Sequence, residues 1–219
     1  MKFLKLVMIV GAVALFMSPS LKAGTVTFDF TNCLFCPPVN NPIGPTATYQ
    51  IGSLIITASG FDNPITPRDL YIKNTGTADE TGLGTTIDTA DHEITDADWV
   101  NLDLSSLAAQ GITSGTFMIG SIQAGEGYSI CNDATVGSLG TVCLPSHGFG
   151  GPTLQPVNVT WSVANPIISV QGFDQVTGTA GGDVLIATLT SQTPEPATLT
   201  LLGMGLFGLA GLRRKIVKD

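Results

Sequence analysis

Two apolar segments, one near each end of the chain, limit how much of it can fold as a globular domain. Lys2 and Lys5 precede the apolar residues 6–17, and the small residue Ala23 follows them. This order is typical of a signal peptide, and an apolar run of 12 residues is too short to span a membrane as a helix. We therefore expect residues 1–23 to form a signal helix that is cleaved on export, with an uncleaved anchor as the alternative.

The second apolar segment, residues 197–212, ends at the basic cluster Arg213-Arg214-Lys215. As a helix it would cover about 24 Å, slightly less than a typical hydrocarbon core of ~30 Å. The basic cluster should stay in the cytoplasm, so the residues before the helix should face outward. A plain anchor would look similar, but here Pro194-Glu195-Pro196 directly precede the apolar run. The two prolines keep that peptide extended and accessible.

The order of these elements resembles the PEP-CTERM sorting signal of Gram-negative bacteria that make exopolysaccharide. The resemblance is carried by Pro194, Glu195, Pro196, Arg213 and Arg214. It implies transient anchoring in the membrane, processing by the transpeptidase-like enzyme exosortase, and a final place at the cell surface or in the extracellular biofilm matrix. The chain then divides into a signal peptide (1–23), an extracytoplasmic domain (24–193) and a sorting signal (194–219), with a transmembrane helix at 197–212 and a basic tail at 213–219.

The central segment, residues 24–193, is long enough for one domain with a sizeable core. It is rich in Thr, Gly, Ser, Val and Ile, and none of its segments shows a long 3.6-residue apolar period. This composition favours strands and turns over helices. We therefore predict an all-β fold, an antiparallel β-sandwich of jelly-roll-like type. The expected strands are residues 25–30, 49–59, 70–73, 99–104, 116–123, 128–131, 157–163, 167–170 and 184–190.

Local signals refine this prediction. Residues 116–123 and 128–131 should form a hairpin, residues 105–110 one helical turn, and residues 37–45 and 145–156 loops. The order of Gly82-Leu83-Gly84, an acidic segment at 91–94 and an alternating strand also resembles the cores often attached to this sorting signal. That second resemblance implies a sandwich and no known activity.

Charge is unevenly distributed along the chain. Residues 24–193 contain only two basic side chains, Arg68 and Lys73, against fifteen acidic ones, which gives a net charge of −13. Such a surface repels nucleic acid and anionic headgroups, so nucleic-acid binding is excluded. It suits an extracellular place near divalent cations or neutral glycans, and solubility alone would also explain it.

The four cysteines predict disulfides, because the domain is exported to an oxidising compartment. Three connectivities are possible, and the one that joins cysteines close in the sequence pairs Cys33 with Cys36 and Cys131 with Cys143. The second bridge would contribute about 3 kcal/mol in the chain-entropy model. A redox role for the first pair would need a helix N-terminus, whereas Pro37 follows directly. A zinc site would need a second closely spaced pair.

The densest acidic patch, residues 79–103, is a candidate calcium site, because hard cations bind six to eight oxygen ligands. A solvated acidic loop is the alternative, since the pattern does not match an EF-hand. The candidate ligands, which all precede an expected strand, are Asp88, Asp91, Glu93, Asp96 and Asp98.

Catalytic signatures are sparse. His92 and His147 are the only histidines, and neither lies in a metalloprotease or nucleophile-elbow motif. Trp99 lies opposite the apolar face of its strand and is a candidate for stacking on sugar rings, whereas Trp161 shares a face with apolar neighbours. We therefore expect a non-enzymatic protein with a structural or adhesive role, whose partners are exosortase, the secretion machinery and exopolysaccharide. The alternatives are a calcium-assisted carbohydrate-binding module and a secreted polysaccharide hydrolase.

Overall fold

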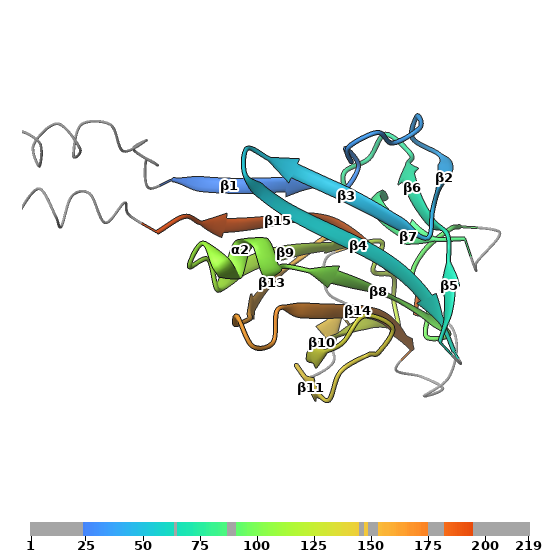
Figure 1. Ribbon diagram of the computed structural model, residues 1–219. Helices are drawn as coiled ribbons and strands as arrows, with labels where there is room; N and C mark the ends of the chain where they lie inside the picture. Colours follow the sequence, from blue (N-terminus) through green and yellow to red (C-terminus); the bar gives the residue numbers. More distant parts are fainter. Residues whose placement is uncertain are drawn as a thin grey trace, which may run out of the picture. The chain divides into compact units, whose positions relative to one another are not determined.

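The computed structural model describes residues 24–63, 65–86, 91–144, 147–148, 153–174 and 182–194. These residues form two antiparallel sheets, as predicted, and a compact unit spans Thr25–Gln192 (Figure 1). The expected signal helix and transmembrane helix lie outside the described residues. Within the described part of the chain, no helix is long and apolar enough to cross a membrane.

The first sheet, sheet A, has the strand order β13-β9-β15-β7-β6-β2, and β1 also pairs with β15. Its strands are β1 (Thr25–Asp29), β2 (Asn41–Gly44), β6 (Leu70–Asn74), β7 (Thr81–Thr85), β9 (Ser114–Gly120), β13 (Gln155–Thr160) and β15 (Leu185–Gln192).

The second sheet, sheet B, has the order β11-β10-β14-β8-β4-β3, with β12 on β10 and β5 on β4. Its strands are β3 (Thr46–Ile51), β4 (Leu54–Asp62), β5 (Thr66–Arg68), β8 (Asp98–Asp103), β10 (Glu126–Ala134), β11 (Val142–Cys143), β12 (His147–Gly148) and β14 (Ile167–Asp174). The helical turn predicted after β8 is confirmed as α2 (Ser105–Ala109).

Period-two alternation builds the core between the sheets. In β1, Val26 and Phe28 are buried, and the threonines beside them are exposed. Phe28 and Phe30 join one apolar cluster with Tyr49 of sheet B. The rings of Phe30 and Tyr49 meet edge to face at 4.8 Å, and the Tyr49 hydroxyl donates a 3.1 Å hydrogen bond to the Phe30 carbonyl. The alternation read from the sequence therefore correctly indicates which side chains face inward.

Two strand predictions are wrong in their pairing. Residues 49–59 are not one strand but parts of the hairpin β3–β4, which turns at Gly52, a residue with φ of 59°. Residues 116–123 and 128–131 do not pair with each other, because β9 belongs to sheet A and β10 to sheet B. The glycine-containing segment between them carries the chain from one sheet to the other, and local turn signals do not distinguish these two kinds of connection.

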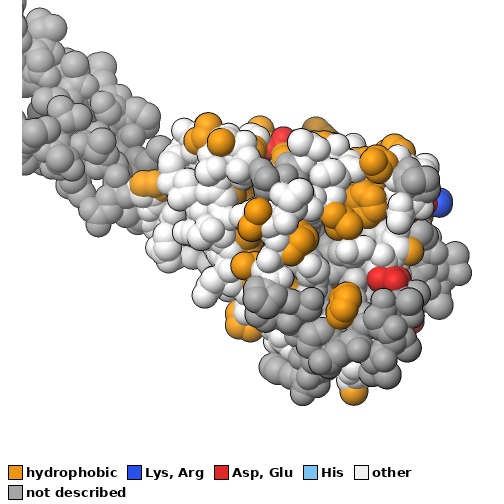
Figure 2. Space-filling model, turned by 90° about the horizontal axis from the view of Figure 1, so that it is seen from below, with side chains coloured by type: hydrophobic (Ala, Val, Ile, Leu, Met, Phe, Trp, Pro, Cys, Tyr) orange, Lys and Arg blue, Asp and Glu red, His pale blue; other side chains and the backbone are white. Residues whose placement is uncertain are grey.

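The two expected loops are partly strands. Residues 37–45 contain β2, and residues 145–156 contain β12 and the start of β13. At the surface, the larger exposed apolar side chains include Phe35, Ile65 and Val163. Figure 2 shows one face of the molecule, on which apolar patches are separated by uncharged polar groups and backbone, with few charged side chains among the atoms described.

Candidate functional site

A fork in sheet A opens a hollow at the surface of the domain. On one side of β15, Ile186 pairs with β7, whereas Thr188 and the residues after it pair with β1. This side of β15 therefore changes its partner strand near Ala187. A pocket of about 540 Å³ opens there, between the end of β1 and the turn that joins β6 to β7. Its volume lies within the usual range for small-ligand sites.

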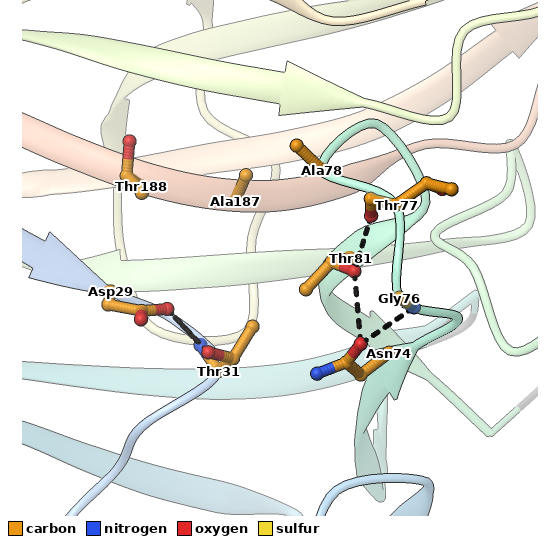
Figure 3. Close-up of a pocket in the computed structure, with 9 residues that line it drawn as sticks. All are labelled: Asp29, Thr31, Asn74, Gly76, Thr77, Ala78, Thr81, Ala187 and Thr188. Carbon is orange, nitrogen blue, oxygen red and sulfur yellow. Dashed lines mark hydrogen bonds between the residues drawn. The ribbon is translucent and has the colours of Figure 1, made fainter.

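Several polar side chains line this fork pocket together with alanine and threonine methyl groups, and local hydrogen bonds hold some of the polar ones in place (Figure 3). The Asp29 carboxylate accepts hydrogen bonds from the backbone N–H and hydroxyl of Thr31, at 2.8 and 2.6 Å. On the opposite wall, Asn74 Oδ1 accepts a 2.9 Å hydrogen bond from the Gly76 N–H and lies 3.4 Å from the Thr81 hydroxyl, which donates to the Thr77 carbonyl at 2.6 Å. The Asn74 side-chain nitrogen points toward the pocket in Figure 3. The pocket therefore presents a carboxylate acceptor and an amide donor.

A second hollow of about 350 Å³ lies farther along β15. It is lined by Thr190 and Gln192, by Ser114 and Thr116 of β9, and by Asn158 of β13, among others. Thr188 lines the fork pocket and Thr190 the second hollow, so two residues that are next neighbours on one strand face connect the two. Both hollows thus belong to one polar surface of sheet A.

The predicted calcium ligands are not gathered into a metal site by the residues described. No group of three or more acidic, histidine or cysteine side chains there is arranged to hold an ion, and Asp88 lies outside the described residues. Glu93 and Asp98 are buried, Asp96 is half-buried and Asp91 is exposed. The four thus do not share one solvent-facing loop.

Glu93 instead takes part in a buried ion pair. Its carboxylate accepts a hydrogen bond from Lys73 and a 2.6 Å hydrogen bond from the Ser121 hydroxyl. Lys73 also lies 2.9 Å from the Glu80 carboxylate. Burial raises the pKa of Glu93 to about 7, although the hydrogen bonds from Lys73 and Ser121 act in the opposite direction. These contacts join β6, the β6–β7 turn and the segment after β9.

Asp98 is fully buried at the start of β8. Its carboxylate accepts 2.6 Å hydrogen bonds from the backbone N–H and the hydroxyl of Thr95, and a hydrogen bond from the Thr85 hydroxyl. Burial raises the pKa of Asp98 to about 6, despite the hydrogen bonds from Thr85 and Thr95. Both buried carboxylates therefore form hydrogen bonds that connect neighbouring segments inside the domain.

Trp99 is not a surface residue, so the prediction that it faces solvent is wrong. Only 4% of it is exposed, and its ring stacks on Phe61 with a centroid distance of 6.1 Å. The reason is that the outer face of sheet B is also covered by part of the chain. The segment after β10 lies over the outer face, where Gly137 donates a 2.7 Å hydrogen bond to Asn101, which in turn donates a 3.0 Å bond to the Ser138 carbonyl.

Gly137 is required for this cover. Its φ is 89°, and a Cβ atom there would come within 3.2 Å of Ile65 and 3.6 Å of Phe61. The alternation of β8 correctly indicates its two faces, but not that both are buried. Trp161, expected in the core, is 5% exposed, and its indole N–H donates a 2.7 Å hydrogen bond to the Ile112 carbonyl.

Both predicted disulfides are confirmed, since Cys33 pairs with Cys36 and Cys131 with Cys143. The second closes the segment that covers sheet B, at a position where β10 and β11 already pair in register. The first lies in the turn between β1 and β2, where Phe35 is 94% exposed. Neither cysteine of this described turn lies in a helix. The turn therefore lacks a helix N-terminus, which is the feature that lowers the pKa of a redox thiol.

The two histidines are not assembled into a described catalytic group. The ring of His92 stacks on Tyr71 with a centroid distance of 3.9 Å. His147 lies in the short strand β12, opposite Tyr128. The side chain of His147 lies outside the atoms described, so the hydrolase alternative gains no geometry from it.

Two antiparallel sheets and two disulfides define an all-β protein of the class suited to an oxidising compartment. Residues 192–215 match the family model of the PEP-CTERM protein-sorting motif. The chain therefore carries a PEP-CTERM protein-sorting motif, which confirms the resemblance seen in its sequence. No curated protein and no solved structure matches it.

The motif implies an exported protein that is processed by an exosortase in a Gram-negative bacterium. Of its predicted residues, Pro194 is described and exposed, two residues beyond the end of β15. Glu195, Pro196, Arg213 and Arg214 lie outside the described residues.

None of the sequence predictions includes the polar surface of sheet A. A signal for it exists, because short polar-x-polar triplets occur in four strands that the fold makes neighbours. They are Thr25-Val26-Thr27, Ser114-Gly115-Thr116, Asn158-Val159-Thr160 and Thr188-Leu189-Thr190.

Proposed function

We propose that this protein is a structural or adhesive component of the bacterial cell surface or exopolysaccharide matrix and has no enzymatic activity. The observation that carries the proposal is the sorting motif at residues 192–215, which begins in the last strand of the domain. Export followed by release at the cell surface delivers the domain to the matrix.

The domain has properties that suit such a place. Two disulfides cross-link it without any need for a bound ion. Its large negative net charge disfavours association with nucleic acid or anionic lipid. The two most deeply buried carboxylates among the described residues, Glu93 and Asp98, already accept hydrogen bonds from neighbouring side chains.

A calcium-assisted carbohydrate-binding module is the main alternative. Its calcium part has no support from the described acidic residues, and its stacking residue, Trp99, is buried. Carbohydrate binding itself does not require either feature, and the polar surface of sheet A is a different place for it.

The proposal is tested by the intact mass and location of the native protein in the producing strain. We expect a form outside the cell that begins near residue 24, ends near residues 194–196 and contains two disulfides. A strain without exosortase should retain the protein in its membrane fraction. Recovery of only the full-length chain in membranes of the normal strain would contradict the proposal.

A further inference from the structure

We propose that the outer face of sheet A binds a neutral polysaccharide chain, which runs from the fork pocket at Asp29 and Asn74 across Thr188 and Thr190 to the second hollow. The ligand class rests on the proposed matrix function, whereas the position of the site rests on geometry alone.

Polar side chains are placed at regular intervals across sheet A. In register, Asn158 of β13 lies opposite Thr116 of β9, Thr116 opposite Thr190 of β15, and Thr190 opposite Thr27 of β1. Strands lie 4.7–4.9 Å apart, so this row of four side chains extends over about 14 Å. A single sugar ring does not need such a length, but a chain of several rings does.

These side chains are accessible and partly pre-ordered. Thr27 and Asn158 are exposed, and Thr116 and Thr190 are half-buried. The Thr27 and Thr190 hydroxyls lie 3.1 Å apart, and the Thr116 hydroxyl donates a 2.7 Å hydrogen bond to Asn158. Such pairs fix the side chains in one arrangement before a ligand binds, which reduces the entropy lost on binding.

The charge of the surface favours a neutral polysaccharide over an acidic one. Asp29 is the one ionisable side chain among the described residues that line the two hollows, although the domain as a whole carries a large negative charge. Acidic polymers are repelled by such a domain. Hydroxyl and amide groups both donate and accept hydrogen bonds, as the hydroxyls of a neutral glycan do. An uncharged polyhydroxyl chain therefore matches the surface.

The fork pocket supplies the strongest contacts. The Asp29 carboxylate offers a charge-assisted acceptor, and the Asn74 side-chain nitrogen offers a donor across from it. Because Asn74 Oδ1 already accepts a hydrogen bond from the Gly76 N–H, the amide is held with its nitrogen toward the pocket. One sugar hydroxyl group can then donate to Asp29 while another accepts from Asn74.

The test uses the exported protein and exopolysaccharide from the producing strain, divided by anion exchange into a neutral and an acidic fraction. In affinity electrophoresis, we expect the neutral fraction to retard the protein and the acidic fraction to leave its mobility unchanged. Absence of retardation by the neutral fraction, for protein with both disulfides intact, would overturn the proposal. Stronger retardation by the acidic fraction would also overturn it.

Matched variants locate the site. Thr188→Val and Thr190→Val remove a hydroxyl at nearly constant shape, and each should weaken binding about two- to tenfold. Asn74→Asp keeps the acceptor for the Gly76 N–H but removes the donor, and should weaken binding by at least as much. The control Thr46→Val changes an exposed threonine of sheet B and should bind as the unchanged protein does. Equal binding by all four variants would refute this location.

The outcomes separate this proposal from the proposed function. A protein that is exported and processed but not retarded by the neutral fraction would refute the binding site alone. A protein that binds the neutral fraction but is never released from membranes would refute the matrix function and leave the site in place.

Discussion

Lys73 donates a hydrogen bond to the carboxylate of Glu93 in the interior of the domain, where 12% and 2% of the two side chains are exposed. Lys73 is one of only two basic residues between positions 24 and 193. An acidic protein therefore uses one of its few cations to neutralise a buried acid. The pair joins β6 to the segment that precedes β8, and its removal gives the first prediction.

Lys73→Met should destabilise the domain by about 3–5 kcal/mol at pH 8, because it removes the cation that stabilises the charged form of the buried Glu93. The loss should be smaller at pH 5, since Glu93 can then bind a proton. Urea denaturation of the exported protein at both pH values measures this. The control Arg68→Met removes a more exposed ion pair with Asp62 and should cost less. An equal loss at both pH values would contradict the prediction.

Asp98 should make the stability of the domain depend on pH. Burial raises its pKa in the folded state from 3.8 to about 6. A raised folded-state pKa gives stability that is complete below pH 4 and is lost as the pH rises through about 6. The difference for this group is on the order of 3 kcal/mol. Glu93, with a pKa of about 7, should add a change in the same direction between about pH 4.5 and 7.

Asp98→Asn isolates the contribution of this residue. The amide oxygen can still accept from Thr95, and the amide nitrogen can donate to the Thr85 hydroxyl, which then donates to the Glu93 carbonyl 3.1 Å away. We expect the variant to be at least as stable as the unchanged protein at pH 7 and to lack the pH-dependent loss between 4 and 6. Denaturant midpoints at several pH values measure both effects, and an unchanged pH profile would argue against the assignment.

Replacement of Cys131 and Cys143 by serine should cost about 3 kcal/mol of unfolding free energy, since the bridge closes a loop of 13 residues. The same change should loosen the cover over Phe61 and make Trp99 more accessible to an aqueous fluorescence quencher. The serine variant of Cys33 and Cys36 should lose less, because its loop is far shorter. Thermal denaturation and quenching provide the two measurements. A larger effect from the shorter loop would contradict this account.

The two tryptophans should respond differently to phenylalanine. Trp161→Phe removes the 2.7 Å hydrogen bond to Ile112 and leaves a buried carbonyl without that donor, so we expect a loss of about 1–3 kcal/mol. The Trp99 indole nitrogen has no hydrogen-bond partner among the described residues. Trp99→Phe should therefore cost less, mainly through packing. Chemical denaturation of both variants makes the comparison, and the reverse order would count against it.

Trp99→Ala should cost about 3–5 kcal/mol, as for other large aromatic residues removed from a core. A solvent-exposed stacking residue would give almost no loss of stability. Comparison of its unfolding free energy with that of Val163→Ala, at a residue 71% exposed, therefore distinguishes the two positions of the ring.

Much of this protein follows from local sequence patterns. The sorting motif depends on a linear order of residues, so Pro194-Glu195-Pro196 and the basic end are recognisable without a fold. The alternation around Val26 and Phe28 predicts an inward face correctly, because strand side chains point to opposite sides at every step. Cys131 and Cys143 are predicted to pair from their spacing and the exported context, and they do.

The tertiary structure alone decided which strands are neighbours and which surfaces are covered. The turn after β9 reads as a hairpin, but long-range pairing places β9 on β13 and β15, and β10 on β14. Trp99 and Asp98 are buried because a distant segment and a second sheet exclude water from them, which no local pattern specifies. Alternation determines the two faces of a strand, whereas burial depends on contacts between residues far apart in the chain.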